Sequence, residues 1–160
     1  MKTKKQIIKR IVFGFLVIVW MITIFCFSNE KSDKSTDTSG SAIKTVLSRF
    51  EQFNNLEQDD QQKLIENLQH PIRKLAHFTI YTIGGMLFFN FINTYKITNK
   101  KKIMFTIIFG ALYAVTDEIH QLFIPGRSGQ ISDILLDTLG VITGCMIMYI
   151  IYKIKTKNQK

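Results

Sequence analysis

Residues 11–27 read IVFGFLVIVWMITIFCF, a run without a charged side chain. With Ile7 and Ile8 the apolar segment covers about 20 residues, the length of α-helix that crosses a hydrocarbon layer of about 30 Å. The run ends with Phe25, Cys26 and Phe27, which do not form the pattern of small residues that a signal peptidase requires. We therefore expect a retained transmembrane helix.

Three more apolar blocks follow, at residues 75–95, 103–124 and 134–152. Each is long enough to span a membrane, which predicts a bundle of four transmembrane helices. Gly140 and Gly144 lie one helical turn apart in the last block, and Gly110 and Ala114 do the same in the third. Small residues at this spacing allow two helices to approach closely.

The distribution of basic residues predicts the orientation of the bundle. The segments before the first block, between the second and third blocks, and after the fourth carry lysine and arginine but no acid; these cations are Lys2, Lys4, Lys5, Lys9, Arg10, Lys96, Lys100, Lys101, Lys102, Lys153, Lys155, Lys157 and Lys160. Cytoplasmic loops of membrane proteins are enriched in such residues. We expect a multi-pass protein of the cell membrane with both termini in the cytoplasm. Because most cations flank apolar blocks, the net charge of +9 does not indicate nucleic-acid binding.

The sequence thus predicts an all-α fold in four parts. These are a basic cytoplasmic start with the first transmembrane helix at 1–27, an extracytoplasmic loop at 28–72, a three-helix core at 73–152 and a basic cytoplasmic tail at 153–160. Within the loop, the polar residues 28–41 suggest irregular structure. Apolar residues then recur at helical spacing from Ala42 to Phe53, and more weakly from Leu64 to Leu68, so the loop should carry one or two short amphipathic helices.

Polar side chains gather at the outer ends of the last three blocks. They are Arg73, Lys74, His77, Tyr81, Asp117, Glu118, His120, Gln121, Arg127, Asp133 and Asp137, and we expect them to form one ligand-binding site. Ionisable groups at membrane depth are costly, so they usually face the bundle interior and pair or perform a function. The spacing agrees, because Lys74, His77 and Tyr81 share one helical face and Asp133 and Asp137 share another.

Two stretches of these blocks resemble motifs of the VanZ-like membrane proteins. They are RKLAHFTIYTIG at 73–84 and DEIHQLFIPGRSG at 117–129, followed by Asp133, Asp137 and Gly140. The resemblance implies a multi-pass membrane protein and makes 73–152 a VanZ-like core. The name-giving member of the family is associated with low-level resistance to the glycopeptide teicoplanin.

Three kinds of site fit these residues. Arg73, Lys74 and Arg127 could hold an anion, with the histidines and acids orienting it. His77, His120, Asp133 and Asp137 could bind a divalent metal such as zinc or manganese, although no cofactor is predicted. The third reading is a purely structural polar core that keeps the helices in register.

Two functions remain open, and with them the question of whether the chain is an enzyme. The favoured one is a non-enzymatic protein that engages an anionic envelope lipid or a cell-wall precursor in the bilayer and affects glycopeptide susceptibility. The alternative is a membrane enzyme, metal-assisted or not, that acts on a phosphorylated lipid at the outer face. Its catalytic candidates would be His77 or His120 as general base or nucleophile, with Asp117 or Glu118 orienting it.

Overall fold

The computed structural model describes residues 4–30 and 32–158, and this part of the chain is helical without strands. The helices are α1 (Lys4–Ser28), α2 (Ser32–Leu47), α3 (Glu51–Asn54), α4 (Gln58–Asn93), α5 (Asn99–Gln121) and α6 (Ile131–Lys157). Four of them, α1, α4, α5 and α6, are long and apolar enough to cross a membrane. The predicted all-α fold with four spans is therefore confirmed.

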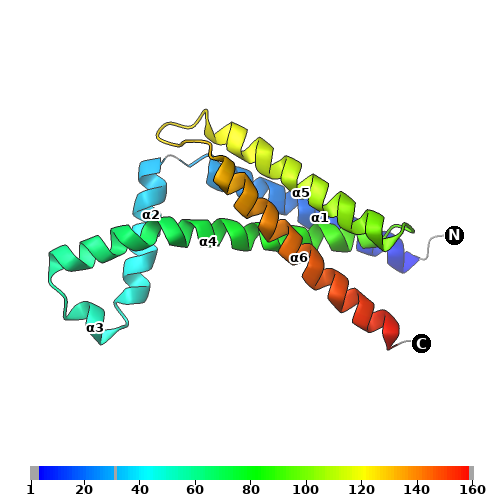
Figure 1. The fold of residues 1–160 in the computed structure, drawn as a ribbon, viewed down its shortest axis with the longest axis horizontal. Coiled ribbons are helices and arrows are strands. Elements are labelled where there is room, and N and C mark those ends of the chain that lie inside the picture. The colour runs from blue at the N-terminus through cyan, green and yellow to red at the C-terminus, as the bar shows by residue number, and fades with distance from the viewer. Residues whose placement is uncertain (1–3, 31, 159–160) are drawn as a thin grey trace.

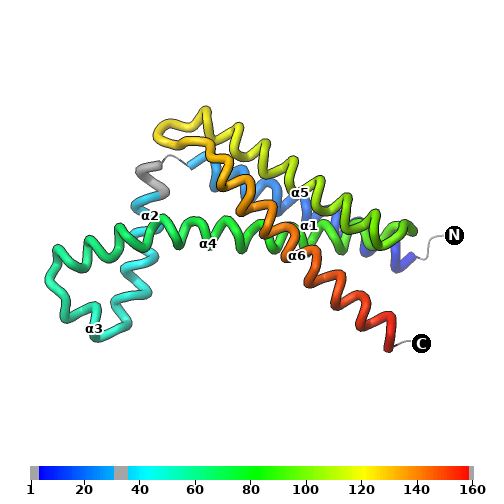
Figure 2. The backbone as a smooth tube through the Cα atoms, viewed as in Figure 1, coloured from blue at the N-terminus to red at the C-terminus, as the bar shows by residue number. Residues whose placement is uncertain are grey.

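The four long helices pack side by side, with both ends of the chain at the same end of the bundle (Figure 1). At the opposite end, α2, α3 and the beginning of α4 form a separate helical projection (Figure 2). The arrangement agrees with an even number of membrane crossings. Which side of the membrane holds the termini stays a prediction, based on the lysine-rich segments.

The orientation can be tested with topology reporters. A reporter fused after Lys160, or inserted in the connection 94–98, is expected to lie in the cytoplasm because basic segments are retained there. A reporter in the connection 55–57, between α3 and α4, should lie outside. Protease protection of the same fusions in sealed cells provides the check, and an external signal at the C-terminus would overturn the N-in/C-in topology.

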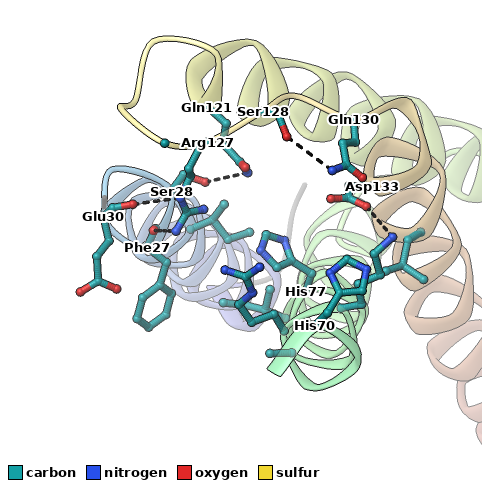
Figure 3. A pocket seen from close by; sticks show the side chains of 17 residues that line it. Phe27, Ser28, Glu30, His70, His77, Gln121, Arg127, Ser128, Gln130 and Asp133 are labelled. Atoms are coloured by element: carbon teal, nitrogen blue, oxygen red, sulfur yellow. Dashed lines mark hydrogen bonds and ion pairs between the residues drawn. The ribbon is translucent and has the colours of Figure 1, made fainter. Parts of the chain in front are cut away.

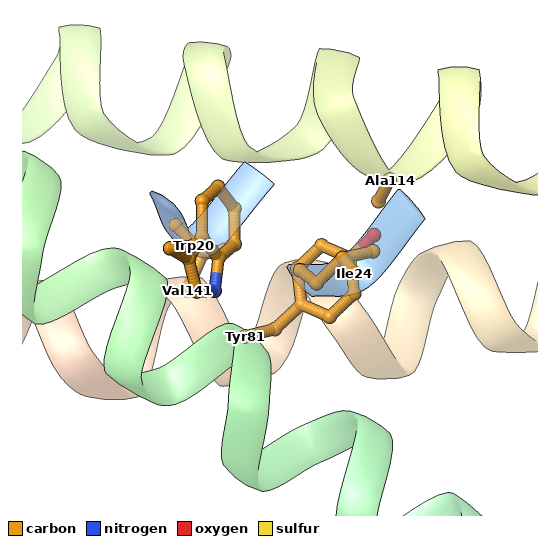
Figure 4. Close-up of a cluster of buried hydrophobic side chains, with 5 residues drawn as sticks. All are labelled: Trp20, Ile24, Tyr81, Ala114 and Val141. Carbon is orange, nitrogen blue, oxygen red and sulfur yellow. The ribbon is translucent and has the colours of Figure 1, made fainter. Parts of the chain in front are cut away.

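The bundle core contains residues from all four long helices. Trp20 and Ile24 of α1 lie beside Tyr81, Ala114 and Val141, and each of these five side chains is buried (Figure 4). The indole of Trp20 donates a hydrogen bond of 2.9 Å to the carbonyl oxygen of Ile80, so its polar edge is satisfied inside an apolar layer. This contact fixes α1 against α4 just below the polar end of the bundle.

The closest helix contact joins α4 and α6 through glycines. A Cβ atom built on Gly144 would overlap the carbonyl oxygen of Thr82, and one on Gly140 would lie 2.6 Å from the carbonyl oxygen of Phe78. From the other side, a Cβ on Gly85 would overlap the carbonyl oxygen of Val141. The expected close approach at Gly140 and Gly144 is confirmed, and it draws the polar beginning of α6 onto α4.

The structure corrects the prediction of irregular structure at 28–41, because α2 already begins at Ser32. Its polar sequence gives little local signal, but tertiary contacts hold the helix. Ile43 of α2 packs with Phe53 and Ile65 in a small apolar cluster, and the side-chain amide of Gln69 donates to the carbonyl oxygen of Thr36 over 3.3 Å. The apolar residues predicted at helical spacing do lie on helices of this projection, but the stretch from Ala42 to Phe53 is divided between α2 and α3, and Leu64 to Leu68 belongs to the long helix α4.

Helix α4 has 36 residues, with Pro71 inside it. At 1.5 Å per residue it is about 54 Å long, well beyond the hydrocarbon thickness of about 30 Å. Its first turns therefore project from the bundle as part of the 28–72 segment. The expected boundary between loop and core at 72/73 falls inside this continuous helix, so both parts are mechanically joined.

Candidate functional site

A pocket of about 350 Å³ lies at the end of the bundle opposite the termini. The end of α1, the middle of α4, the connection 122–130 and the beginning of α6 surround it. Its lining residues are Ile24, Phe27, Ser28, Glu30, His70, Arg73, Lys74, Ala76, His77, Ile80, Gln121, Gly126, Arg127, Ser128, Gln130, Asp133 and Leu136. Figure 3 shows Ser28 and Arg127 on one side of the pocket and His70 and His77 on the other.

The connection between α5 and α6 places Arg127 at the pocket. Pro125 and Gly126 occupy the central positions of a turn in which the Arg127 amide donates to the Ile124 carbonyl oxygen over 3.1 Å. Gly126 has a φ of 78°, which is the left-handed conformation that a type II turn requires at this position.

The guanidinium of Arg127 binds the end of α1. Its Nε donates to the Glu30 carbonyl oxygen over 2.9 Å, and Nη2 donates to the Phe27 carbonyl oxygen over 3.2 Å. Phe27 lies in the last turn of α1 and Glu30 just after it, where backbone carbonyls lack intrahelical partners. Burial, and next the positive charge of Arg73, lower the pKa of Arg127 below its ordinary value. Arg73 and Arg127 both line the pocket.

The cations of α4 differ in their partners. Lys74 Nζ lies 3.1 Å from a carboxylate oxygen of Asp133, and both side chains are about one-third exposed, at 33% and 28%. Arg73 also lines the pocket, but among the described residues it makes no hydrogen bond and no ion pair. Its guanidinium is thus the pocket cation with the most unused donors.

A buried layer of polar groups lies next to the pocket. His77 lines the pocket, and its Nδ1 lies 3.7 Å from the carboxylate of Asp137, which is 0% exposed. Asp117 accepts a hydrogen bond from the Ser28 hydroxyl and one of 3.3 Å from the Gln121 amide. Ligand atoms of His77, Asp117 and Asp137 lie within 4.8 Å of one another. Three helices therefore meet in one polar cluster.

Three expected site residues are neither among the pocket lining nor among the cluster of His77, Asp117 and Asp137. His120 stacks on the ring of Phe25 with 4.7 Å between ring centroids, away from the cluster of His77, Asp117 and Asp137. Glu118 accepts a hydrogen bond of 2.8 Å from the backbone N–H of Gln130 and so holds the beginning of α6. Tyr81 is 0% exposed within the aromatic core.

The structure thus divides the eleven expected residues into groups. Those that line the pocket are Arg73, Lys74, His77, Gln121, Arg127 and Asp133. Asp117 and Asp137 lie in the buried layer, whereas the expected metal candidates His120 and Asp133 lie outside the metal-compatible cluster. Ser28, His70 and Gln130 are pocket residues that sequence reasoning missed. Ser28 gave one faint signal, as the first polar residue after an apolar block.

A family model described as VanZ/LLP1 matches residues 13–152 of the chain. The match includes residues of all four long helices, and it contains the pocket and the buried layer. No curated protein and no solved structure matches the chain.

Proposed function

The chain belongs to the VanZ/LLP1 family and is a membrane protein of VanZ type, and from this premise we propose that its pocket binds an anionic lipid or cell-wall precursor at the outer face of the cell membrane. Occupancy of the pocket would lower susceptibility to glycopeptides such as teicoplanin. The proposal concerns binding, with phosphate as the group recognised.

The observation that carries the proposal is the guanidinium of Arg73, which lines the pocket without a partner among the described residues. Arg127 lines the same pocket, and within the described part of the chain backbone carbonyls engage two of its three donor nitrogens. Guanidinium groups bind phosphate through paired hydrogen bonds, and such charge-assisted bonds are about twice as strong as neutral ones. Two arginines that line one pocket favour an anion, because an anion relieves their mutual repulsion.

The apolar part of the lining fits a lipid rather than a free ion. Ile24, Phe27, Ile80 and Leu136 line the pocket together with the cations. A pocket lined by cations and by apolar side chains suits an amphipathic ligand whose charged head and first methylene groups bind together. Its place at one end of a transmembrane bundle agrees with a head group at the membrane surface.

A second candidate function is an enzyme acting on the same phosphorylated lipid. The observation that favours it is that His77 Nδ1 lies 3.7 Å from the buried carboxylate of Asp137, because a histidine beside a carboxylate is a frequent general base. His77 also lines the pocket. The binding experiment separates the two functions when the lipid is recovered afterwards, since only the enzyme would return it chemically changed.

The binding test uses the full chain in detergent micelles. A polyprenyl phosphate is titrated in, alongside the corresponding uncharged polyprenol and inorganic phosphate. We expect saturable binding of one polyprenyl phosphate per chain, with the polyprenol about 10- to 100-fold weaker because it lacks the charge-assisted hydrogen bonds. Native mass spectrometry of the complexes provides the stoichiometry.

The comparison ligands define what would contradict the proposal. Equal affinity for the polyprenyl phosphate and the polyprenol would show that the cations of the pocket do not recognise the head group. If inorganic phosphate binds as tightly as the polyprenyl phosphate, the pocket is an anion site, but it does not recognise a lipid.

A further inference from the structure

The cluster of His77, Asp117 and Asp137 contains buried ligand atoms without partners. Asp137 is 0% exposed, and neither of its carboxylate oxygens has a hydrogen bond among the described residues. The Nδ1 atom of His77 has none either, and it lies 3.7 Å from the nearer Asp137 oxygen, beyond hydrogen-bonding distance. A buried carboxylate without hydrogen bonds is costly unless a charge or a metal compensates it.

Asp117 is oriented toward the same point by its own partners. The Ser28 hydroxyl of α1 donates to one of its oxygens and the Gln121 amide of α5 to the other. The carboxylate is 5% exposed, and each oxygen keeps a further lone pair. Partners that hold a ligating carboxylate in place are a regular feature of metal sites, where they fix the ligand before the ion arrives.

From these observations we propose that His77, Asp117 and Asp137 bind a divalent transition-metal cation, zinc or manganese. One imidazole nitrogen with two carboxylates is a donor set that suits both ions. The charges also balance, because a dication neutralises the two carboxylates while His77 stays neutral. A protonated His77 alone would compensate only one of them.

To bind one ion, the ligand atoms of His77, Asp117 and Asp137 must move slightly closer together. The three ligand atoms lie within 4.8 Å of one another. Bonds of about 2.0–2.2 Å to a common ion place ligand atoms about 3–4 Å apart, so they must close by about 1 Å. They sit on α4, α5 and α6, so a bound ion would tie three spans together. Because three protein ligands leave at least one coordination position open and His77 lines the pocket, that position would face the pocket.

This inference goes beyond anion binding, because the site needs no lipid to take up the ion. The test therefore uses the full chain in detergent, stripped of metal with a chelator, and titrates in zinc, manganese or magnesium alone. We expect one zinc or manganese ion per chain by calorimetry and a higher melting temperature with the ion bound, since a ligand of the folded state stabilises it. Magnesium should bind at least about tenfold more weakly, because it prefers oxygen ligands.

Matched variants assign the site to its residues. Asp137→Asn and His77→Gln should each weaken zinc binding at least about tenfold and abolish the thermal shift, since each removes a ligand. The controls are Asp60→Asn, at an exposed acid on the same helix α4, and His120→Gln, at the histidine stacked on Phe25. Both should keep the affinity of the wild type.

Two results would overturn the proposal. The first is that the folded wild-type protein, stripped of metal, takes up no stoichiometric zinc or manganese. This result does not depend on whether any variant folds. The other is equal affinity in Asp137→Asn and Asp60→Asn. Neither result affects the anion site, because that site is tested by titrating polyprenyl phosphate and not a metal ion.

Discussion

Replacing Gly144 by leucine is expected to remove most of the folded protein from the membrane. Any Cβ at this position would overlap the carbonyl oxygen of Thr82, which belongs to the backbone of α4. Overpacking in a well-packed interior already costs about 1–3 kcal/mol when side chains can move, and a backbone cannot rotate away. We therefore expect a loss of at least about 3 kcal/mol, because α4 and α6 must separate.

The measurement is the melting temperature of purified protein in detergent, together with its abundance in membranes. Thr79→Leu is the control, because it introduces the same side chain at an exposed position of α4. That variant should match the wild type in both readouts. A Gly144→Leu protein with unchanged melting temperature and abundance would mean that the close packing of α4 on α6 is not what holds the bundle.

The spans could be predicted from sequence because each requires only a long apolar block. Helix α2 could not, since its polar residues carry a weak helical pattern and packing against α4 holds it. The same limit applies to the beginning of α4, where Pro71 suggests a helix start but the helix continues through it. In both cases the decisive contacts join segments distant in sequence.

The residues of the candidate site could be predicted from the sequence, but their division between the pocket, the buried cluster and other contacts could not. Asp117, His120 and Gln121 lie at helical spacing, which places them on neighbouring positions of one face. Spacing alone does not tell which position meets which neighbouring helix. In the structure Asp117 and Gln121 face Ser28, whereas His120 turns toward Phe25. Because both partners lie on α1, far away in sequence, only the fold reveals the division.

Arg127 shows how one side chain combines two roles. Sequence reasoning grouped it with Arg73 and Lys74 as an anion ligand, and it does line the pocket. Its hydrogen bonds to the Phe27 and Glu30 carbonyl oxygens also cap the end of α1. A substitution at Arg127 would therefore mix ligand binding with stability. Arg73 and Lys74 offer the cleaner experiment.

The double variant Arg73→Gln/Lys74→Gln is expected to weaken polyprenyl phosphate binding about 100-fold or more, since each lost charge-assisted hydrogen bond is worth about 1.5–3 kcal/mol. Stability should change by less than about 1 kcal/mol, because the pair of Lys74 with Asp133 is partly exposed. Calorimetric titration of the lipid and thermal melting in detergent measure the two quantities side by side.

The same variant tests the link to glycopeptides. Wild-type protein expressed in a susceptible host should raise tolerance to teicoplanin more than to vancomycin, and the double variant should lose this gain at equal abundance. Lys153→Gln/Lys155→Gln is the matched control, since it removes two exposed charges at the opposite end of the bundle and should behave as the wild type. If the double variant binds lipid weakly yet protects fully, pocket occupancy does not cause the tolerance. If the Arg73→Gln/Lys74→Gln variant binds the lipid and protects as well as the wild type, the cations of α4 do not form the anion site.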